Sequence, residues 1–251
     1  MSCKVMGIVN VTPDSFSDGG KYFTPEEAVR RAVNLASEGA AIIDIGGEST
    51  GPGSTPLDWS EEWERVEGVL KALVERGLMG ADGKRISLSI DTYHPETAAR
   101  AVECGADMIN CVYAESAPEM VEIARGASKE VSLVLPYSCR TLKSLSQASK
   151  PFVYFDPMIG FGGSREEDIE LLRSIRETAA QVPVLVGASR KRVIKRLVGV
   201  KTPGKDIAGN LAVAVWAALS GASVVRVHDV KETVQALRVI DILREEGKRG
   251  L

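Results

Sequence analysis

The sequence of 251 residues has few of the residue types that mark metal-binding, disulfide-rich or nucleic-acid-binding proteins. It contains two histidines and four cysteines without a CxxC spacing, which excludes the common zinc fingers and gives no disulfide framework. The formal net charge is −3 and no block of lysine and arginine suggests a tail, so nucleic acid is not an expected partner, and the local cluster "SRKRVIKR" (189–196) stays a candidate anion site. No apolar run is long enough to span a bilayer, and the N-terminus has no signal-peptide core. We therefore predict a cytoplasmic protein without membrane contact.

The remaining composition is that of an ordinary globular protein, with 44% hydrophobic and 26% charged residues. The length suits one large core, and no linker or low-complexity segment divides the chain. We predict a single domain covering residues 1–251.

A pattern of helix, Gly-Ala and apolar strand recurs in "SEGAAIIDIGG", "ECGADMINCV" and "LSGASVVRVHD". Each glycine suits the end of a helix, and each apolar run suits a buried parallel strand. When the rest of the chain is divided into the same units, it is predicted to form strands at 4–9, 40–45, 86–90, 108–112, 131–135, 152–155, 183–187 and 223–227. The predicted helices are 24–36, 58–73, 95–104, 117–126, 165–180, 190–198, 207–220 and one beginning at 229.

Eight strands alternating with helices in about 250 residues predict an α/β fold of the (β/α)₈ TIM-barrel type. A doubly wound open sheet is the alternative, because periodicity alone does not distinguish the two. The fifth and sixth strands are separated only by "YSCRTLKSLSQASK", so the helix of that connection is predicted to be short or missing.

Polar residues stand where the predicted strands end, and in a barrel these ends form the active site. Asp91, Asn110 and Asp156 offer acceptors and an amide, which suits a flat heterocycle with several N–H groups. A second set, which suits a phosphate or carboxylate, offers positive charge: Lys191, Arg226 and His228.

Each of these residues also has a purely structural interpretation. Asp91 could cap the next helix, and His228 could be a packed histidine bonded to backbone. The segment "GFGGSR" (160–165) lacks the GK[ST] ending of a phosphate loop and is interpreted as a turn. Their convergence at one barrel mouth favours a site.

Six segments resemble the dihydropteroate synthase family of pterin-binding barrels, in order along nearly the whole chain: "MGIVNVTPDSFSDGG", "IIDIGGEST", "SIDT", "DPMIGFG", "LVGASRK" and "VVRVHDV". The resemblance implies condensation of 6-hydroxymethyl-7,8-dihydropterin pyrophosphate with p-aminobenzoate, releasing pyrophosphate in the presence of Mg²⁺. It also implies a homodimer, associated through the last helices, for which the apolar "LAVAVWAALSGA" (211–222) is suited.

The family's site residues carry over by matching positions. Asn10 is expected at the metal, and the pterin is expected to contact Asp91, Asn110, Asp156 and Lys191. The pyrophosphate is expected to contact Ser49, Arg226 and His228. The p-aminobenzoate site is expected to include Thr50, Phe161, Ser189 and the stem of Lys191, and Gly187 is expected in the substrate site. Catalytic roles are expected for Lys191, Arg226 and His228, with the loop from Asp14 to Phe23 folding over the substrates.

The outer rim departs from the family pattern. Gly51 stands where the family's "GGESTRPG" has arginine, and "LPYSCR" replaces a Met-His-Met stretch. Cys111 replaces an aspartate, and "GFGGS" lacks the usual lysine. These changes predict weaker p-aminobenzoate binding and tolerance of sulfonamides, which compete for that site. Two alternatives stay open, a pterin-binding methyltransferase coupled to a corrinoid protein and a non-catalytic pterin-binding paralogue.

Overall fold

A computed structural model describes residues 3–12, 24–48, 55–142, 145, 151–161, 163–200, 202 and 205–249. Its strands are β1 (Lys4–Asn10), β2 (Ile42–Gly46), β3 (Ser87–Asp91), β4 (Met108–Asn110), β5 (Ser132–Pro136), β6 (Val153–Asp156), β7 (Leu185–Val186) and β8 (Val224–Val227). Its α-helices are α1 (Pro25–Ser37), α2 (Trp59–Arg76), α3 (Pro95–Cys104), α4 (Ala117–Gly126), α5 (Arg165–Ala179), α6 (Arg192–Val198), α7 (Ile207–Leu219) and α8 (Val230–Arg249).

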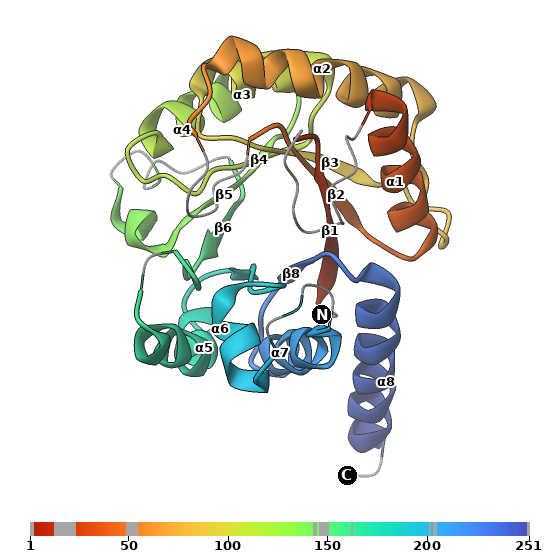
Figure 1. The fold of residues 1–251 in the computed structure, drawn as a ribbon, viewed down its shortest axis with the longest axis vertical. Coiled ribbons are helices and arrows are strands. Elements are labelled where there is room, and N and C mark those ends of the chain that lie inside the picture. The colour runs from red at the N-terminus through yellow and green to blue at the C-terminus, as the bar shows by residue number, and fades with distance from the viewer. Residues whose placement is uncertain are drawn as a thin grey trace.

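The eight strands form one parallel sheet in the order β6-β5-β4-β3-β2-β1-β8-β7. A parallel bridge between Phe155 and Val184 links β6 to the segment before β7, so the ends of the sheet meet. The helices surround the ring of strands, as Figure 1 shows. The (β/α)₈ barrel is confirmed, and the open doubly wound sheet is wrong because its strand order would not be sequential.

The helix starts follow from local capping chemistry. Thr24 and Glu27 form a capping box at the start of α1, and Asp58 and Glu61 form another at α2. Each box satisfies backbone N–H groups that the first helical turn leaves free, and a cap of this kind contributes about 1 kcal/mol.

The connection from β5 to β6 differs from the others, as predicted. Within the described residues it contains a 3₁₀ helix, η2 (Tyr137–Thr141), and no α-helix. Strand β7 is shorter than predicted, since only Leu185 and Val186 pair in the sheet and the chain leaves it at Gly187.

Alternation of side chains along the strands separates an apolar plug from a polar layer inside the barrel. Seven buried residues form a cluster apart from the main core: Met6, Ile42, Met108, Val134, Tyr154, Leu185 and Val224. Side chains at alternate positions of a strand point to the same side of the sheet, so the next inward positions lie two residues after those of the cluster. On four strands these positions hold Asp44, Asn110, Asp156 and Arg226.

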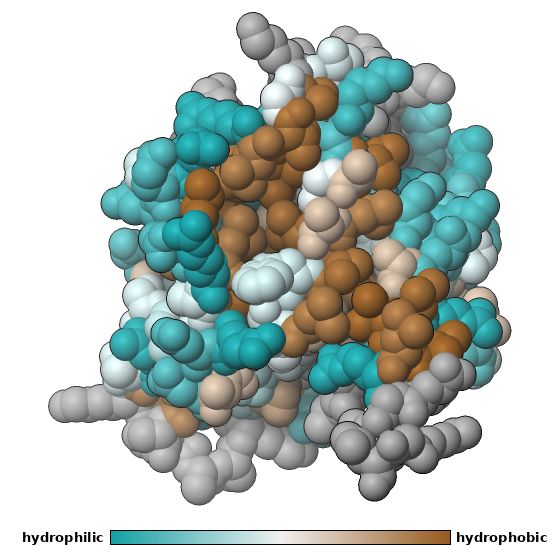
Figure 2. Space-filling view, turned by 90° about the horizontal axis from the view of Figure 1, so that it is seen from below, coloured by the Kyte–Doolittle hydropathy of each residue, from teal (hydrophilic) through white to brown (hydrophobic). Residues whose placement is uncertain are grey.

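The outer face of the last helices is apolar, and Figure 2 shows the brown side chains gathered there. The exposed large hydrophobic residues of α6, α7 and α8 are Leu197, Val198, Ile207, Trp216, Leu219, Val239, Ile242 and Leu243. None of the described helices combines the length and the hydrophobicity that crossing a membrane requires.

Candidate functional site

The centre of the site is the guanidinium of Arg226, which lies between two carboxylates from other strands. Its Nε donates to Asp44 Oδ2 at 2.5 Å, and its Nη2 donates to Asp91 Oδ2 at 2.5 Å. The side-chain amide of Asn110 also donates to Asp44 Oδ2, at 3.0 Å. Asp91 therefore pairs with a cation and does not cap α3, whose N-cap residue is His94.

Burial and charge act in opposite directions on this cluster. Burial lowers the pKa of Arg226, but the charges of Asp91 and Asp44 more than offset it, so the guanidinium stays protonated. Burial raises the pKa of Asp91 to about 7, against the lowering effect of Arg226 and with further raising by Asp44 and Glu62. Burial thus favours the neutral form of Asp91, and the ion pair with Arg226 favours its charged form.

Asp156 and Lys191 form the second charged part of the site. Asp156 Oδ1 accepts the backbone N–H of Met158 at 2.7 Å, and burial raises the pKa of its carboxyl group. Lys191 Nζ donates to the carbonyl of Ile159 at 2.6 Å and lies 4.0 Å from the ring centroid of Phe161. Burial lowers the pKa of Lys191 to about 8, with Asp156 opposing this shift.

Two glycines keep backbone close to these groups. Gly160 has φ +81°, and a Cβ atom there would lie 2.6 Å from Lys191 Cδ, so a larger residue would displace the lysine. At Gly187 a Cβ atom would lie 3.6 Å from Asp156 Oδ2 and 3.9 Å from Arg226. Glycine at 187 thus leaves space open beside both polar groups.

The surroundings of His228 favour its neutral form. Its Nδ1 lies 3.1 Å from Ser189 Oγ, and its carbonyl accepts a hydrogen bond from Arg31. Burial, followed by the charges of Arg190 and Arg226, holds its pKa well below the ordinary value. Burial and the neighbouring cations therefore favour the neutral imidazole over the positive charge predicted from the sequence, and a neutral imidazole can still donate or accept a hydrogen bond.

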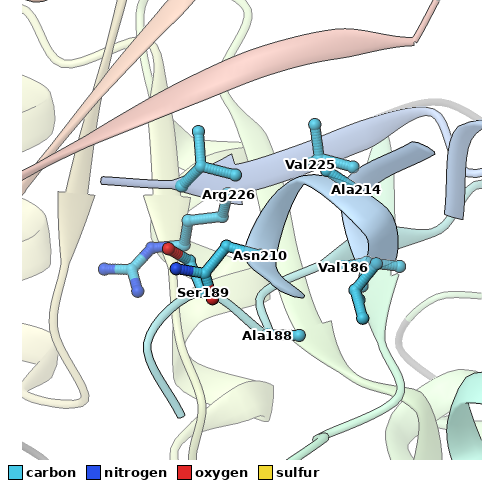
Figure 3. A pocket seen from close by; sticks show the side chains of 9 residues that line it. Val186, Ala188, Ser189, Asn210, Ala214, Val225 and Arg226 are labelled. Carbon is cyan, nitrogen blue, oxygen red and sulfur yellow. The ribbon is translucent and has the colours of Figure 1, made fainter. Parts of the chain in front are cut away.

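Next to this histidine, the loop after β7 holds a strained residue. Arg190 has φ 60°, its N–H donates to Asn210 Oδ1 at 3.0 Å, and its guanidinium pairs with Asp229 at 2.8 Å. A small pocket lies between β7, β8 and α7, and in Figure 3 the guanidinium of Arg226 extends away from it, past Asn210. Asn210 on α7 and Asp229 before α8 therefore hold the loop that carries Ser189 and Lys191.

A further polar network holds the chain after β2, and the sequence patterns did not predict it. Tyr93 donates to Glu48 Oε1 at 2.8 Å, and His94 Nε2 lies 3.4 Å from Glu48 Oε2. Arg65 on α2 donates to the carbonyl of Gly47 at 3.0 Å. The network fixes Gly47 and Glu48, where the segment "GGESTGPGS" (46–54) begins, against α2 and the residues that follow β3.

The structure brings together Asp91, Asn110, Asp156, Gly187, Ser189, Lys191, Arg226 and His228 at the carboxyl ends of the strands. Ser49, Thr50, Gly51 and the first loop lie outside the described residues. Asp44 received no role from the sequence, although a charged residue inside the apolar run "AIIDI" signals a buried partner.

The residues fit a metal only with help from a substrate. Within the described ranges, no group of three or more His, Cys, Asp or Glu side chains could hold a metal ion. Asn10 at the end of β1 can supply one amide oxygen. Mg²⁺ commonly takes one or two protein ligands and completes its shell with water and substrate phosphates, so this donor set suits such a shared site.

The arrangement defines the class of protein. A barrel with a buried floor of acceptors, flanked by a lysine and an arginine, can hold a flat N–H-rich ring and place an attached anion near cations. The chain matches the pterin-binding enzyme family over residues 6–149 and 145–228, and it belongs to that family.

Similar proteins within this family are dihydropteroate synthases. The chain is 37% identical to that of Staphylococcus haemolyticus over 262 residues, covering 96% of this chain and 95% of the relative. The Xanthomonas albilineans enzyme, solved with 4-aminobenzoic acid, is 37% identical with a TM-score of 0.83 over 97% of this chain and 94% of that one. The Yersinia pestis enzyme, solved with a sulfonamide drug, is 33% identical with a TM-score of 0.85 over 97% and 95%. The resemblance to dihydropteroate synthase, and the enzyme function predicted with it, are confirmed.

Proposed function

We propose that this chain condenses 6-hydroxymethyl-7,8-dihydropterin pyrophosphate with p-aminobenzoate to give dihydropteroate and pyrophosphate. One observation carries the assignment of the site, namely the acceptor floor of Asp91, Asn110 and Asp156 beside the partly buried cations Lys191 and Arg226. The acceptors match the N–H groups of a pterin, and the cations match a pyrophosphate.

The reaction is a substitution at the pterin methylene carbon. The bond from this carbon to the pyrophosphate oxygen breaks, the amine nitrogen of p-aminobenzoate forms the new bond, and the amine loses one proton. An electron-rich pterin can carry positive charge at the methylene carbon, so no strong general base is required. Arg226 Nε and Nη2 are held by Asp44 and Asp91, and Nη1 makes no hydrogen bond to a described residue, which leaves it for the departing oxygens.

His228 and Asn10 complete the expected anion site. The neutral imidazole of His228 would donate a hydrogen bond to the pyrophosphate, and Ser189 would orient the ring. Asn10 would hold Mg²⁺ together with substrate oxygens, and the ion would offset the negative charge of the leaving group. Ser49 would contact the same anion, and Thr50, Phe161 and the stem of Lys191 would border the p-aminobenzoate.

The direct test is formation of dihydropteroate from the two substrates by the purified protein with Mg²⁺. The proposal predicts product with release of one pyrophosphate for each dihydropteroate. Binding of pterin without product would support the non-catalytic paralogue. Methyl transfer from methyltetrahydrofolate to a corrinoid protein, without dihydropteroate, would support the methyltransferase.

Gly51 is expected to weaken binding at the p-aminobenzoate end and to confer sulfonamide tolerance. Relative to arginine, glycine lacks a charge-assisted contact to an anion and costs more entropy to order. Introducing Gly51→Arg is expected to lower the p-aminobenzoate KM about 10- to 100-fold, since such a contact contributes roughly 1.5–3 kcal/mol when shielded from solvent. The variant should also be inhibited more strongly by a sulfonamide.

Steady-state kinetics with a sulfonamide titration measure both effects. Gly53→Arg is the matched control, because it adds the same charge two residues further along the chain. Inhibition of the wild-type protein as strong as that of Gly51→Arg would contradict the expected tolerance.

We further propose that the apolar face of α7 and α8 joins two copies of the chain, which would work in the cytoplasm as a homodimer. Val239, Ile242 and Leu243 are 56%, 47% and 61% exposed and lie three and four residues apart, so they form one stripe on α8. Trp216 on the neighbouring α7 is 46% exposed, with its indole N–H already bonded to the carbonyl of Leu172. A continuous apolar face of this kind is typical of an interface.

Light scattering is expected to give a mass near twice 26.9 kDa for the wild-type protein. The double variant Val239→Asp with Leu243→Asp should give the monomer mass, because two buried carboxylates would oppose association. Met79→Asp changes an apolar residue that is 53% exposed and lies outside α7 and α8, and should leave the dimer intact. A monomeric wild-type protein across a wide concentration range would refute the dimer.

A further inference from the structure

Asp44 is a charged residue in the middle of a buried strand. Its side chain is fully buried, and its neighbours along β2 are the apolar Ile43 and Ile45. Leaving a carboxylate there is costly unless its charge and its acceptors are matched. One oxygen, Oδ2, carries both of its side-chain contacts, while Oδ1 is buried without a hydrogen-bond partner among the described residues.

The contact with Asn110 determines which way that amide faces. A carboxylate paired with a guanidinium can only accept hydrogen bonds, so the amide must turn its Nδ2 toward Asp44. Asn110 Oδ1 then points the other way, and it is buried without a partner among the residues described. A substrate above the floor therefore meets an acceptor at this position and no donor.

The contact with Arg226 determines the plane of the guanidinium. Asp44 and Asp91 hold Nε and Nη2 from two neighbouring strands, in which Gly46 and Asp91 are paired across the sheet. A guanidinium has a fixed fork of donors, so two anchored nitrogens fix the third. The direction of Nη1 follows from the two carboxylates.

We propose that Asp44 is a positioning residue for the pterin site, which sets Asn110 as an acceptor and Arg226 as a fixed cation without touching the substrate. This rests on the proposed function, because the N–H groups that Asn110 would meet are those of a pterin. Substitution by asparagine keeps the shape but removes the constraint, since an amide at 44 can donate as well as accept and Asn110 can then face either way.

Calorimetry with 6-hydroxymethylpterin tests the proposal. We expect Asp44→Asn to weaken binding about 10- to 100-fold, as a misoriented partner leaves a buried N–H group unpaired. Asp107→Asn is the matched control. Asp107 pairs with Arg85 and Lys129 where β4 begins, at the opposite end from Asn110, and its variant should bind pterin like the wild type. Wild-type affinity in a folded Asp44→Asn protein would overturn the proposal.

A double-mutant cycle separates positioning from a general loss of structure. If Asp44 acts through Asn110, the variant carrying both Asp44→Asn and Asn110→Ala should lose little more affinity than the worse single variant. Losses that multiply would show two independent roles and overturn the proposal. The acid limb of the kcat/KM profile gives a second readout. Asp91 faces Arg226, Asp44, Glu62 and Lys191, so removing the charge of Asp44 should lower the pKa of Asp91 and move that limb to lower pH.

A crystal structure of the wild-type protein with 6-hydroxymethylpterin keeps the proposal testable should Asp44→Asn fail to fold. Asn110 should accept from a ligand N–H while donating to Asp44, and a ligand acceptor atom placed on Asn110 would overturn it. A wild-type protein that binds the pterin but forms no dihydropteroate would refute the proposed reaction, and the binding tests of Asp44 would still apply.

Discussion

Arg226→Ala is expected to reduce kcat roughly 100- to 1000-fold, the range found when one donor to a developing negative charge is removed. The guanidinium is held by Asp44 and Asp91, so its position does not depend on the substrate. Such a preorganised donor stabilises the departing pyrophosphate without having to reorganise in the transition state. Steady-state kinetics with the pterin pyrophosphate measure the loss.

Arg226→Ala is also expected to change the pH dependence of kcat/KM and the binding of the pterin. Alanine at 226 leaves two carboxylates without their cation, and the pKa of Asp91 should rise above its value of about 7. The acid limb of kcat/KM should therefore move to higher pH, opposite to the shift expected for Asp44→Asn. At a pH on the alkaline plateau of both profiles, calorimetry should show a smaller loss in binding of pterin without phosphates than in kcat. Equal losses in both would place Arg226 at the pterin and not at the leaving group.

His228→Ala is the matched comparison for the leaving-group role. The imidazole is neutral, because burial and the charges around it hold its pKa well below the ordinary value. A neutral donor stabilises an anion less than a guanidinium does, so its kcat loss should be smaller than that of Arg226→Ala. A larger loss for His228→Ala would show that Arg226, because it is paired with Asp44 and Asp91, contributes little to stabilising the leaving group.

The fold could be predicted from the sequence because each unit carries its own local signals. The capping residues Thr24 and Asp58 mark helix starts, and Gly105 adopts the left-handed conformation that closes α3. Closure of the sheet could not be derived from periodicity, since the bridge from Phe155 to Val184 joins segments that are not patterned differently from those of an open sheet.

Residue types at strand ends predicted the site's members but not their pairing. The alternation that places Arg226 inward is visible in "VVRV", yet its partners come from β2 and β3, far away in the sequence. The charge of His228 could not be predicted either, because it depends on burial and on Arg190 and Arg226 nearby. Charge states at such a site follow from three-dimensional neighbours.

Asp156→Ala is expected to weaken 6-hydroxymethylpterin binding about 100-fold. The carboxylate is buried, one of its oxygens already accepts the N–H of Met158, and the other lies toward the space beside Gly187. Alanine would leave the N–H groups of the pterin edge buried and unpaired, at a cost of about 1–3 kcal/mol and more when the lost acceptor is charged. Calorimetry measures the loss, and thermal unfolding checks that the variant is folded.

The pH dependence of pterin binding provides a second test of the role of Asp156. Burial raises the pKa of Asp156, and a protonated carboxyl group accepts an N–H bond poorly, so wild-type affinity should fall as the pH decreases through that raised value. Asp156→Asn should lose that part of the pH dependence and keep the part near pH 7 that belongs to Asp91. Removing the carboxylate should also lower the pKa of Lys191 below about 8, because Asp156 contributes the largest of the effects that oppose burial there. A folded Asp156→Asn protein with the affinity and pH profile of the wild type would show that Asp156 does not bind the pterin.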